Sequence, residues 1–417
     1  MIKLVSSGVG LAAFIALAVS AAAPAVHAGD RHHDSDDNRY VVTNLVSDIA
    51  KLGGKVIDPN LKNAWGVAFS PAASPFWIAD NAAGLSTLYD GDGTIVSLAS
   101  PSGGVTIPCP PPATVGQGSS CPPSPPPNNA APTGMVWNPT TSNTTGFLVP
   151  LTGKMASFIW ATEDGTLSAW TGGLTSNPFN AVLAVNNANV PNATLGAVYK
   201  GLAVGVNVNG VSVNGGTDFV LLFVTNFRAG TVEAFAPAST SSTTGFYVPV
   251  TTDGNFTDAD IPPGYAPFGI QNINGDLFVT YAKQNAQKHD DVAGTGNGFV
   301  DVFDTDGHLL HRFASRGALN SPWGVARASS AFGRFSGDIL VGNFGDGRIN
   351  VFDSDGNFLA QLRDTNGKPL SIDGLWTVTL GGGAKSSSDT LYFTAGPNGE
   401  TDGLFGTITP AQDIDDN

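Results

Sequence analysis

The sequence has little charge, few cysteines and, beyond its first 28 residues, no apolar run long enough to cross a membrane. Charged residues make up 13% of the 417 positions, and no long stretch places apolar residues at the i, i+3, i+4 spacing of an amphipathic helix. Basic residues are also scarce, because 19 Lys and Arg stand against 34 Asp and Glu without forming a basic stripe. The missing helical spacing argues against a helical fold. The net charge of −15 repels phosphate backbones, so we do not expect a nucleic acid partner.

The one long apolar run lies at the start of the chain. Lys3 precedes "GLAAFIALAVSAAA", and "VHA" stands before Gly29, which is the arrangement of a secretory signal peptide and its cleavage site. We predict a signal peptide over 1–28, no membrane span after its removal, and an extracytoplasmic location, either secreted or periplasmic. Loss of Lys3, the one charged residue of that segment, takes the net charge from −15 to −16. Residues 29–39 and the acidic tail 411–417 are predicted to be disordered.

Cys109 and Cys121 are the only cysteines, and both lie in a segment, 101–132, that contains eleven prolines. In an oxidising compartment we expect them to form a disulfide that closes this small loop. A catalytic thiol would require a histidine nearby, and none lies close in the sequence. Two cysteines alone would also leave a metal site incomplete. We interpret 101–132 as a surface insertion in extended conformation.

A pattern of three or four short strands recurs six times along the chain. The first strand of each unit is apolar and surrounds a Gly, with Thr377 in that place in the sixth unit, over 63–69, 131–137, 198–204, 266–272, 321–327 and 374–380. The second strands are expected over 76–81, 158–164, 222–227, 277–282, 339–344 and 391–396, and a third strand follows each. A fourth is expected in several units, as over 308–314 and 358–362. Glycine in the first strand suits a crowded centre where backbones approach closely.

Six such units predict an all-β fold, a six-bladed β-propeller of the NHL-like type over 40–410, in which each sheet packs against its neighbours. The last unit ends at "GTITP" without a fourth strand, and "YVVTNLVSDI" (40–49) alternates like a strand but has no unit of its own. We therefore predict that this N-terminal strand joins the last blade and closes the ring. A β-sandwich is the alternative, and the six-fold repetition argues against it.

The motifs "DPNLKNAWGVAFS", "ATEDGTLSAW", "PPGYAPFGIQNI", "LVGNFGDGRINVFD" and "LYFTAGPNGETDGLFGTI", together with the other repeat strands, resemble a family of secreted bacterial proteins of unknown activity. The resemblance covers nearly the whole chain after the signal segment. It implies an NHL-like six-bladed propeller and no established reaction. Many members of that family end in a sorting anchor with a Pro-Glu-Pro motif, which does not occur in "DIDDN" at the end of this sequence.

Polar residues stand where the second strands end. Asp80, Glu163, Asn226 and Asn343 would converge if this rim faced the mouth of the central channel, and carboxylate and amide oxygens bind hard cations such as Ca²⁺. Gluconolactonase-like propellers hold a divalent ion with ligands of this type, although their motifs do not align with this chain residue by residue. The alternative is structural, since Asn and Asp after a strand commonly cap turns.

Other polar motifs carry weaker functional signals. The stretches "DGDG", "DTDG" and "DSDG" are interpreted as hairpin turns, because they lack the further ligands of an EF-hand loop. His289 lies in a long polar loop beside Asp290 and Asp291, where a histidine is usually solvated, and a zinc site of two or three histidines is not expected. Glu400 and Asp402 lie near the end of the ring and either cap the channel or bend the chain.

Three functions fit this sequence. The first is an exported binding scaffold for an extracellular polymer, a surface protein or a small ligand. The second is a hydrolase or lactonase that depends on a divalent metal held by the four rim residues. The third is a structural role in an extracellular matrix. The sequence contains no G-x-S-x-G elbow that would indicate a serine hydrolase of that type.

Overall fold

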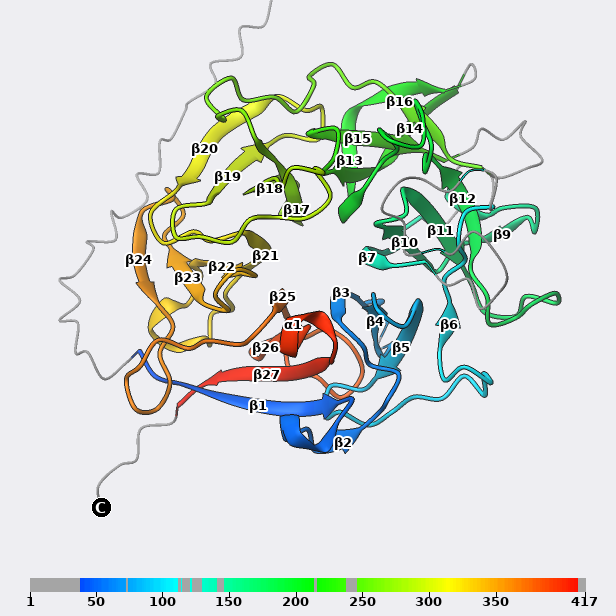
Figure 1. Ribbon diagram of the computed structural model, residues 1–417. Coiled ribbons are helices and arrows are strands. Elements are labelled where there is room, and N and C mark those ends of the chain that lie inside the picture. Colours follow the sequence, from blue (N-terminus) through cyan, green and yellow to red (C-terminus); the bar gives the residue numbers. More distant parts are fainter. Residues whose placement is uncertain are drawn as a thin grey trace, which may run out of the picture. The chain divides into compact units, whose positions relative to one another are not determined.

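Six small sheets of mainly antiparallel strands surround a central axis, and the strand with the repeated Gly, or with Thr377 in the sixth sheet, lies innermost in each (Figure 1). The computed structural model describes residues 38–72, 74–111, 114, 121, 130–140, 146–213, 216–237 and 246–411. These residues belong to one unit of the chain, Asp36–Asn417. The predicted signal peptide, most of the polar segment 29–39 and most of the acidic tail lie outside the described residues. The predicted six-bladed propeller is confirmed.

Blades 1 to 3 follow the predicted repeat units. Blade 1 consists of β3 (Ala64–Ala68), β4 (Phe76–Asp80), β5 (Leu85–Tyr89) and β6 (Val105–Thr106). Blade 2 consists of β7 (Pro132–Trp137), β10 (Phe158–Thr162), β11 (Thr166–Trp170) and β12 (Val182–Asn186), with a separate hairpin of β8 (Leu148–Val149) and β9 (Lys154–Met155). Blade 3 consists of β13 (Tyr199–Val213), β14 (Gly216–Asn226), β15 (Thr231–Ala236) and β16 (Val248–Val250).

Blades 4 and 5 have the same order of strands. Blade 4 consists of β17 (Tyr265–Ile273), β18 (Asp276–Lys283), β19 (Gly298–Phe303) and β20 (Leu309–Ser315). Blade 5 consists of β21 (Pro322–Arg327), β22 (Ile339–Asn343), β23 (Ile349–Phe352) and β24 (Phe358–Gln361). The named helical elements are single turns, η2 (Ala50–Leu52), η4 (Gly333–Phe335) and α1 (Pro397–Glu400). None of these has the length or apolar character needed to cross a bilayer.

Blade 6 combines the two ends of the described chain. It contains β25 (Leu375–Leu380), β26 (Leu391–Ala395) and β27 (Leu404–Pro410), and β1 (Tyr40–Ser47) pairs antiparallel with β27, from Tyr40 opposite Pro410 to Ser47 opposite Leu404. A short fifth strand, β2 (Val56–Ile57), lies parallel to the outer side of β1. Figure 1 shows the blue β1 beside the red β27. The predicted closure of the ring by the N-terminal strand is therefore confirmed.

The repeated glycine marks the place where neighbouring inner strands touch. Each inner strand contacts the inner strand of the next blade. A Cβ added at Gly134 would lie 2.3 Å from the backbone nitrogen of Leu202, and one at Gly269 would lie 2.1 Å from the carbonyl oxygen of Trp323. Blade 6 has Thr377 in this position, and its hydroxyl donates a hydrogen bond of 2.7 Å to the carbonyl of Trp65 in blade 1. Blades 6 and 1 are thus joined by the Thr377 hydrogen bond, whereas at Gly134 and Gly269 the inner strands lie too close for any side chain.

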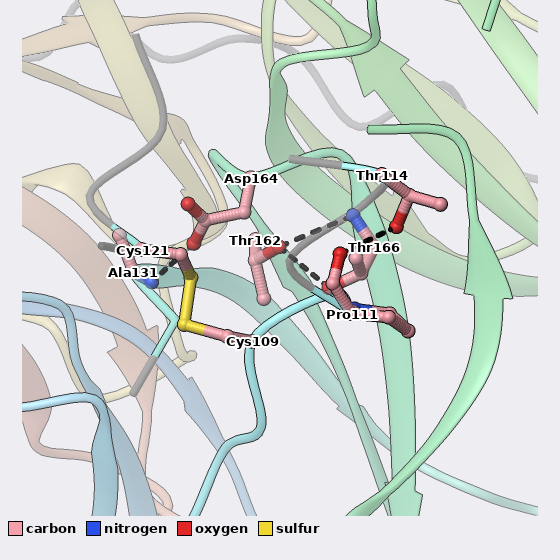
Figure 2. Close-up of a disulfide and its surroundings, with 8 residues drawn as sticks. All are labelled: Cys109, Pro111, Thr114, Cys121, Ala131, Thr162, Asp164 and Thr166. Atoms are coloured by element: carbon pink, nitrogen blue, oxygen red, sulfur yellow. Dashed lines mark hydrogen bonds between the residues drawn. A yellow bond between two sulfur atoms is a disulfide. The ribbon is translucent and has the colours of Figure 1, made fainter. Parts of the chain in front are cut away.

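The proline-rich insertion is anchored to blades 1 and 2. Cys109 and Cys121 form a disulfide, and Cys121 is buried in the core cluster of these blades together with Val105 and Ile107 (Figure 2). At the end of the insertion, the backbone nitrogen of Ala131 donates a 2.7 Å hydrogen bond to Asp164. The described parts of the insertion are therefore partly core, although the sequence predicted a surface loop throughout.

Candidate functional site

Aromatic side chains close the centre of the ring. Trp65, Phe268, Trp323 and Trp376 come from the inner strands of blades 1, 4, 5 and 6 and belong to one buried cluster. The rings of Trp65 and Trp376 are stacked with centroids 3.4 Å apart, and Trp323 lies edge-on to both. Each of the four directly precedes the position of close backbone contact, Gly66, Gly269, Gly324 or Thr377. Four of the six blades thus each contribute one aromatic residue from the same register to this cluster.

Lys200 occupies this register in blade 3. Its side chain is 3% exposed, and its ammonium lies 5.2 Å from the ring centroid of Trp65 and 5.9 Å from that of Phe227. The ammonium donates a hydrogen bond to Glu163 and lies 3.5 Å from an oxygen of Asp290. Burial favours the neutral amine, but the charges of Glu163 and Asp290 outweigh that effect and raise the pKa of Lys200. Lys200 is therefore a buried, permanently charged cation above the aromatic cluster.

Glu163 is held beside Lys200 by residues at the ends of β10 and β4. It follows β10 directly, and its second carboxylate oxygen accepts a 3.0 Å hydrogen bond from Asn81, which follows β4. Burial raises the pKa of Glu163, yet the charges of Lys200 and His289 and the hydrogen bonds from Lys200 and Asn81 reverse the effect and leave it below the usual range. Glu163 is therefore an ionised carboxylate at the physiological pH.

A chain of amides extends the cluster to blade 6. Asn63 donates hydrogen bonds to Asn81, at 3.1 Å, and to Glu400, at 2.8 Å, and accepts one of 3.0 Å from the indole nitrogen of Trp376. Burial, and next the charge of Glu163, raise the pKa of Glu400. Glu400 thus belongs to the polar network at the channel mouth, whereas Asp402 accepts hydrogen bonds from Asn398 and from the backbone of Asn63.

The loop between β18 and β19 completes the cluster. His289 Nδ1 lies 2.7 Å from an oxygen of Asp290, in hydrogen-bond contact. That hydrogen bond, with the charge of Lys200, lowers the pKa of Asp290 against the opposing effect of burial. One ligand atom each of Glu163, His289 and Asp290 lie within 4.8 Å of one another. The mouth therefore contains a possible acidic metal site, made of a residue of blade 2 and two of blade 4.

The four residues predicted from the sequence have separate hydrogen-bond partners in the structure. Asp80 is buried inside blade 1, where one oxygen accepts a 2.8 Å hydrogen bond from the backbone of Thr87 and burial raises its pKa well above the usual value. Glu163 lies in the mouth cluster. The side chains of Asp80 and Asn81 project from opposite sides of the strand end, so Asn81, one residue later, is the one that reaches the mouth.

The two asparagines of the set hold turns within their own blades. The Asn226 side chain accepts hydrogen bonds from the backbone of Val198 and Ala229 and donates one to Glu233. The Asn343 side chain accepts one from the backbone of Asn320 and donates to Ala318 and Asp346. These contacts agree with the structural alternative for both residues. Metal binding by the predicted set of four stays a prediction.

Lys200 is the residue that sequence reasoning missed. The position before the close-contact residue is aromatic in four blades and Thr133 in blade 2, so a lysine there is an exception within the repeat. A comparison of the six copies at this position, and not only at the strand ends, would have identified it.

A cavity of about 1150 Å³ adjoins the cluster. Its walls come from the segment before β13, the turn after β14 and the β18–β19 loop, and the residues are Pro191, Thr194, Leu195, Arg228, Ala229, Asn285, Ala286, Gln287, Lys288, His289 and Asp290. His289 and Asp290 belong to both the cavity and the charged cluster. By contrast, the space among the inner strands, beside Gly66, Gly134 and Gly324, amounts to only about 50 Å³. The space between these three glycines is therefore too small for a ligand larger than a few water molecules, whereas the cavity at the mouth has room for one.

Comparison with known proteins identifies relatives but no reaction. No protein-family model matches the chain. It is 30% identical over 378 residues to Uncharacterized protein R648 of Acanthamoeba polyphaga mimivirus, an alignment that covers 90% of this chain and 80% of the viral protein. It is 31% identical over 285 residues to Uncharacterized protein R640 of the same virus, covering 67% of this chain and 48% of that protein.

Solved structures with a similar fold are much more distant. A streptogramin B lyase has a TM-score of 0.45 and 11% identity, covering 90% of this chain and 99% of the lyase. A gluconolactonase from Xanthomonas campestris has a TM-score of 0.45 and 13% identity, covering 84% of this chain and 86% of that enzyme. Likenesses at this level concern the fold alone.

Proposed function

Because the chain belongs to the same protein family as Uncharacterized protein R648 of the mimivirus, a relationship that supplies no reaction, we propose a function from the channel mouth itself. The protein is an exported binding protein that takes up a small ligand, or the end of a polymer chain, in the cavity beside the charged cluster. One observation carries this proposal: the cavity of about 1150 Å³ shares His289 and Asp290 with the group of charges around the buried Lys200.

The lining of the cavity supports a ligand with both apolar and hydrogen-bonding groups. Pro191, Leu195 and Ala229 offer apolar surface, and Asn285 and Gln287 offer amides. Ligand sites commonly combine a mainly apolar wall with a few polar groups that fix orientation. A volume of about 1150 Å³ suits a ligand of several sugar units or a comparable molecule.

The cluster itself supports binding because its charges are held in place before a ligand arrives. Lys200 is fixed by Glu163, and Glu163 is fixed in turn by Asn81 and, through it, by Asn63. A site that is already ordered loses little conformational entropy when it binds. The part of Asp290 that remains exposed, 58% of its side chain, offers a carboxylate to hydroxyl or amino groups of the ligand.

Export is part of the proposal. The Cys109–Cys121 disulfide supports an oxidising compartment, where such bonds persist. The other two functions predicted from the sequence, a metal-dependent hydrolase and a matrix protein, differ from binding in measurable ways. A hydrolase would convert the bound ligand, and a matrix protein would not need an open cavity.

The experiment is ligand capture with a blocked cavity. Leu195 lies on the cavity wall with 55% of its surface exposed, so Leu195→Arg fills the cavity without disturbing the core. Leu359→Arg, on the outer strand of blade 5 with 45% exposed, is the matched control. A mixture of mono- and oligosaccharides, peptides and small organic acids is incubated with each protein, and bound compounds are identified by mass spectrometry. We expect wild type and Leu359→Arg to retain the same compounds and Leu195→Arg to lose them at least tenfold. Equal retention by all three proteins would contradict the proposal.

A further inference from the structure

We propose that a second cavity, at the end of the channel opposite the mouth, binds a small neutral molecule with an apolar ring on one side and a hydrogen-bonding group on the other. The cavity has a volume of about 470 Å³ and is lined by residues that follow the positions of close contact in the inner strands of blades 1 to 4 and 6. The mouth cluster contains residues that precede those positions. We call the second cavity the rear hollow. The inference goes beyond the proposed function, because the rear hollow shares no lining residue with the cavity at the mouth.

The lining of the rear hollow is divided into an apolar and a polar part. All ten lining residues from blades 1 to 3 are apolar, and they include Met135 and Trp137. The three lining residues from blades 4 and 6 are Gln271, Asn272 and Thr379, and all are polar. A ligand that matches this division places an apolar ring against blades 1 to 3 and a hydroxyl or amide group against blades 4 and 6.

The rear hollow narrows where it meets the channel. Val67, Met135, Leu202, Gln271 and Thr379 line both the hollow and the space of about 50 Å³ between the inner strands. Met135 and Leu202 are 5% and 4% exposed and belong to the core of blades 1 to 3, so the narrow end is largely apolar. A volume of about 470 Å³ lies in the lower part of the range of ligand pockets and suits a molecule of one ring.

The rear hollow is also free of charge. None of the described residues that line it is ionisable, although the chain has a net charge of −15. The cavity at the mouth, by contrast, includes Arg228, Lys288, His289 and Asp290. A charged ligand would lose hydration in the rear hollow without gaining an ionic partner, which is unfavourable. The site should therefore select a neutral molecule over ions of similar shape.

The polar part contains one amide that is held in place and one that is available. Asn272 donates a 3.0 Å hydrogen bond to the carbonyl of Val204 and accepts one of 2.9 Å from the backbone nitrogen of Gly275. Gln271 is exposed, and its side chain forms no hydrogen bond within the part of the chain that the structure describes. Because a glutamine amide both donates and accepts, Gln271 can bind a hydroxyl group of the ligand.

The apolar side of the rear hollow continues outward along β13. Val206 lies two residues after the lining residue Val204, on the same side of the strand, and is 58% exposed. The opposite side of β13 packs against blade 4, where Asn207 donates a 2.9 Å hydrogen bond to the carbonyl of Thr305. This bond holds the strand in place while Val206 faces solvent. Apolar surface left exposed at the rim of a cavity is a common feature of ligand-binding grooves.

The test is titration of three small molecules that share one ring, benzyl alcohol, benzoate and benzylammonium, into the whole protein at neutral pH, followed by NMR. We expect benzyl alcohol to bind about tenfold or more tightly than either ion. Gln271→Ala should weaken binding of benzyl alcohol by about fivefold, because it removes the amide partner. Gln287→Ala is the matched control and should leave that binding unchanged, since Gln287 is also exposed but lines the cavity at the mouth.

A second measurement locates the ligand without relying on Gln271→Ala. Met135 is one of three methionines in the chain, so a nuclear Overhauser effect between its methyl group and the ring of benzyl alcohol can be assigned with Met135→Leu. We expect this effect in wild type and in Leu195→Arg, in which the cavity at the mouth is filled. Circular dichroism checks that each variant folds.

Four outcomes would overturn the inference: no saturable binding of benzyl alcohol, equal binding of the two ions, binding that Gln271→Ala leaves intact, or binding that is lost in Leu195→Arg. Capture of ligands by the cavity at the mouth is measured separately. Failure at the rear hollow with intact capture at the mouth therefore removes this inference and leaves the proposed function in place.

Discussion

At the residue scale, this protein buries charge in two different ways. Lys200 keeps its charge because two carboxylates face it. Asp301, on β19 of blade 4, also has an ionic partner, since Arg312 on β20 bridges it to Asp258. Even so, burial raises the pKa of Asp301 to about 6, because the effect of burial exceeds that of the nearby guanidinium. One oxygen of Asp301 lacks a hydrogen-bond partner within the described residues, which adds to the cost of its ionisation.

This carboxyl makes the stability of the fold depend on pH. Between about pH 4 and 6 the unfolded chain releases the proton of Asp301 and the folded protein retains it, so this group favours folding at low pH and the contribution is lost as the pH rises. We expect the unfolding free energy of wild type, relative to Asp301→Asn, to fall by about 2–3 kcal/mol from pH 4 to pH 7. Urea unfolding of both proteins at constant ionic strength measures this difference. A difference that does not change with pH would contradict the assignment.

The orientation of single side chains also explains why the candidate site was only partly predictable. The sequence analysis considered polar residues at the ends of the second strands, and one of them, Glu163, lies in the mouth cluster. Asp80 was selected instead of Asn81 because the sequence does not say which of two consecutive residues faces the axis, and a shift of one residue reverses the side. Asp290, on a loop of blade 4, and Lys200, on the inner strand of blade 3, meet only in the folded chain, and no local pattern encodes that contact.

At the scale of the strand, the inner strands were the most predictable elements. Their glycines repeat because the backbone of the next blade occupies the space that a Cβ would need. This packing requirement is therefore visible in the sequence as a glycine at the same position of successive units. The length of the β13–β14 hairpin was not predicted, since its outer part contains Gly210 and several Asn that resemble a loop. Hydrogen bonds from Asn207 and Asn209 to Asp306 of blade 4 hold that part in place. Such contacts between blades are not visible in local propensity.

The close contact at Gly269 leads to a prediction about this element. A methyl group there would overlap the carbonyl of Trp323, at 2.1 Å, so the two inner strands must separate. We expect Gly269→Ala to lower the unfolding free energy by about 1–3 kcal/mol. Gly172→Ala is the matched control, because no atom lies within 4 Å of its added Cβ, and it should change stability by less than about 0.5 kcal/mol. Equal losses in urea unfolding would show that the glycine is not required by packing.

At the scale of the whole molecule, the stability of the ring depends on a single strand from the other end of the chain. β1 supplies the fourth strand of blade 6, and Tyr40 packs in the core between blades 5 and 6 against Phe332 and Phe335. The Tyr40 nitrogen donates to Arg363 and the Asn44 carbonyl accepts from Lys55, so both face away from β27. Because successive residues of a strand point their backbone groups to opposite sides, Thr43 faces β27 and Val42 does not.

This alternation allows a matched pair of proline substitutions. Thr43→Pro removes an N–H that pairs with β27 and should lower the unfolding free energy by about 3 kcal/mol, whereas Val42→Pro, on the side away from β27, should cost clearly less. Backbone amide hydrogen exchange should then be faster throughout β26 and β27 in Thr43→Pro, because blade 6 opens as a unit when β1 no longer pairs with β27. The amides of blades 2 and 3 should keep their protection. Equal effects of the two prolines, or faster exchange in all six blades at once, would mean that β1 does not act as the latch of this ring.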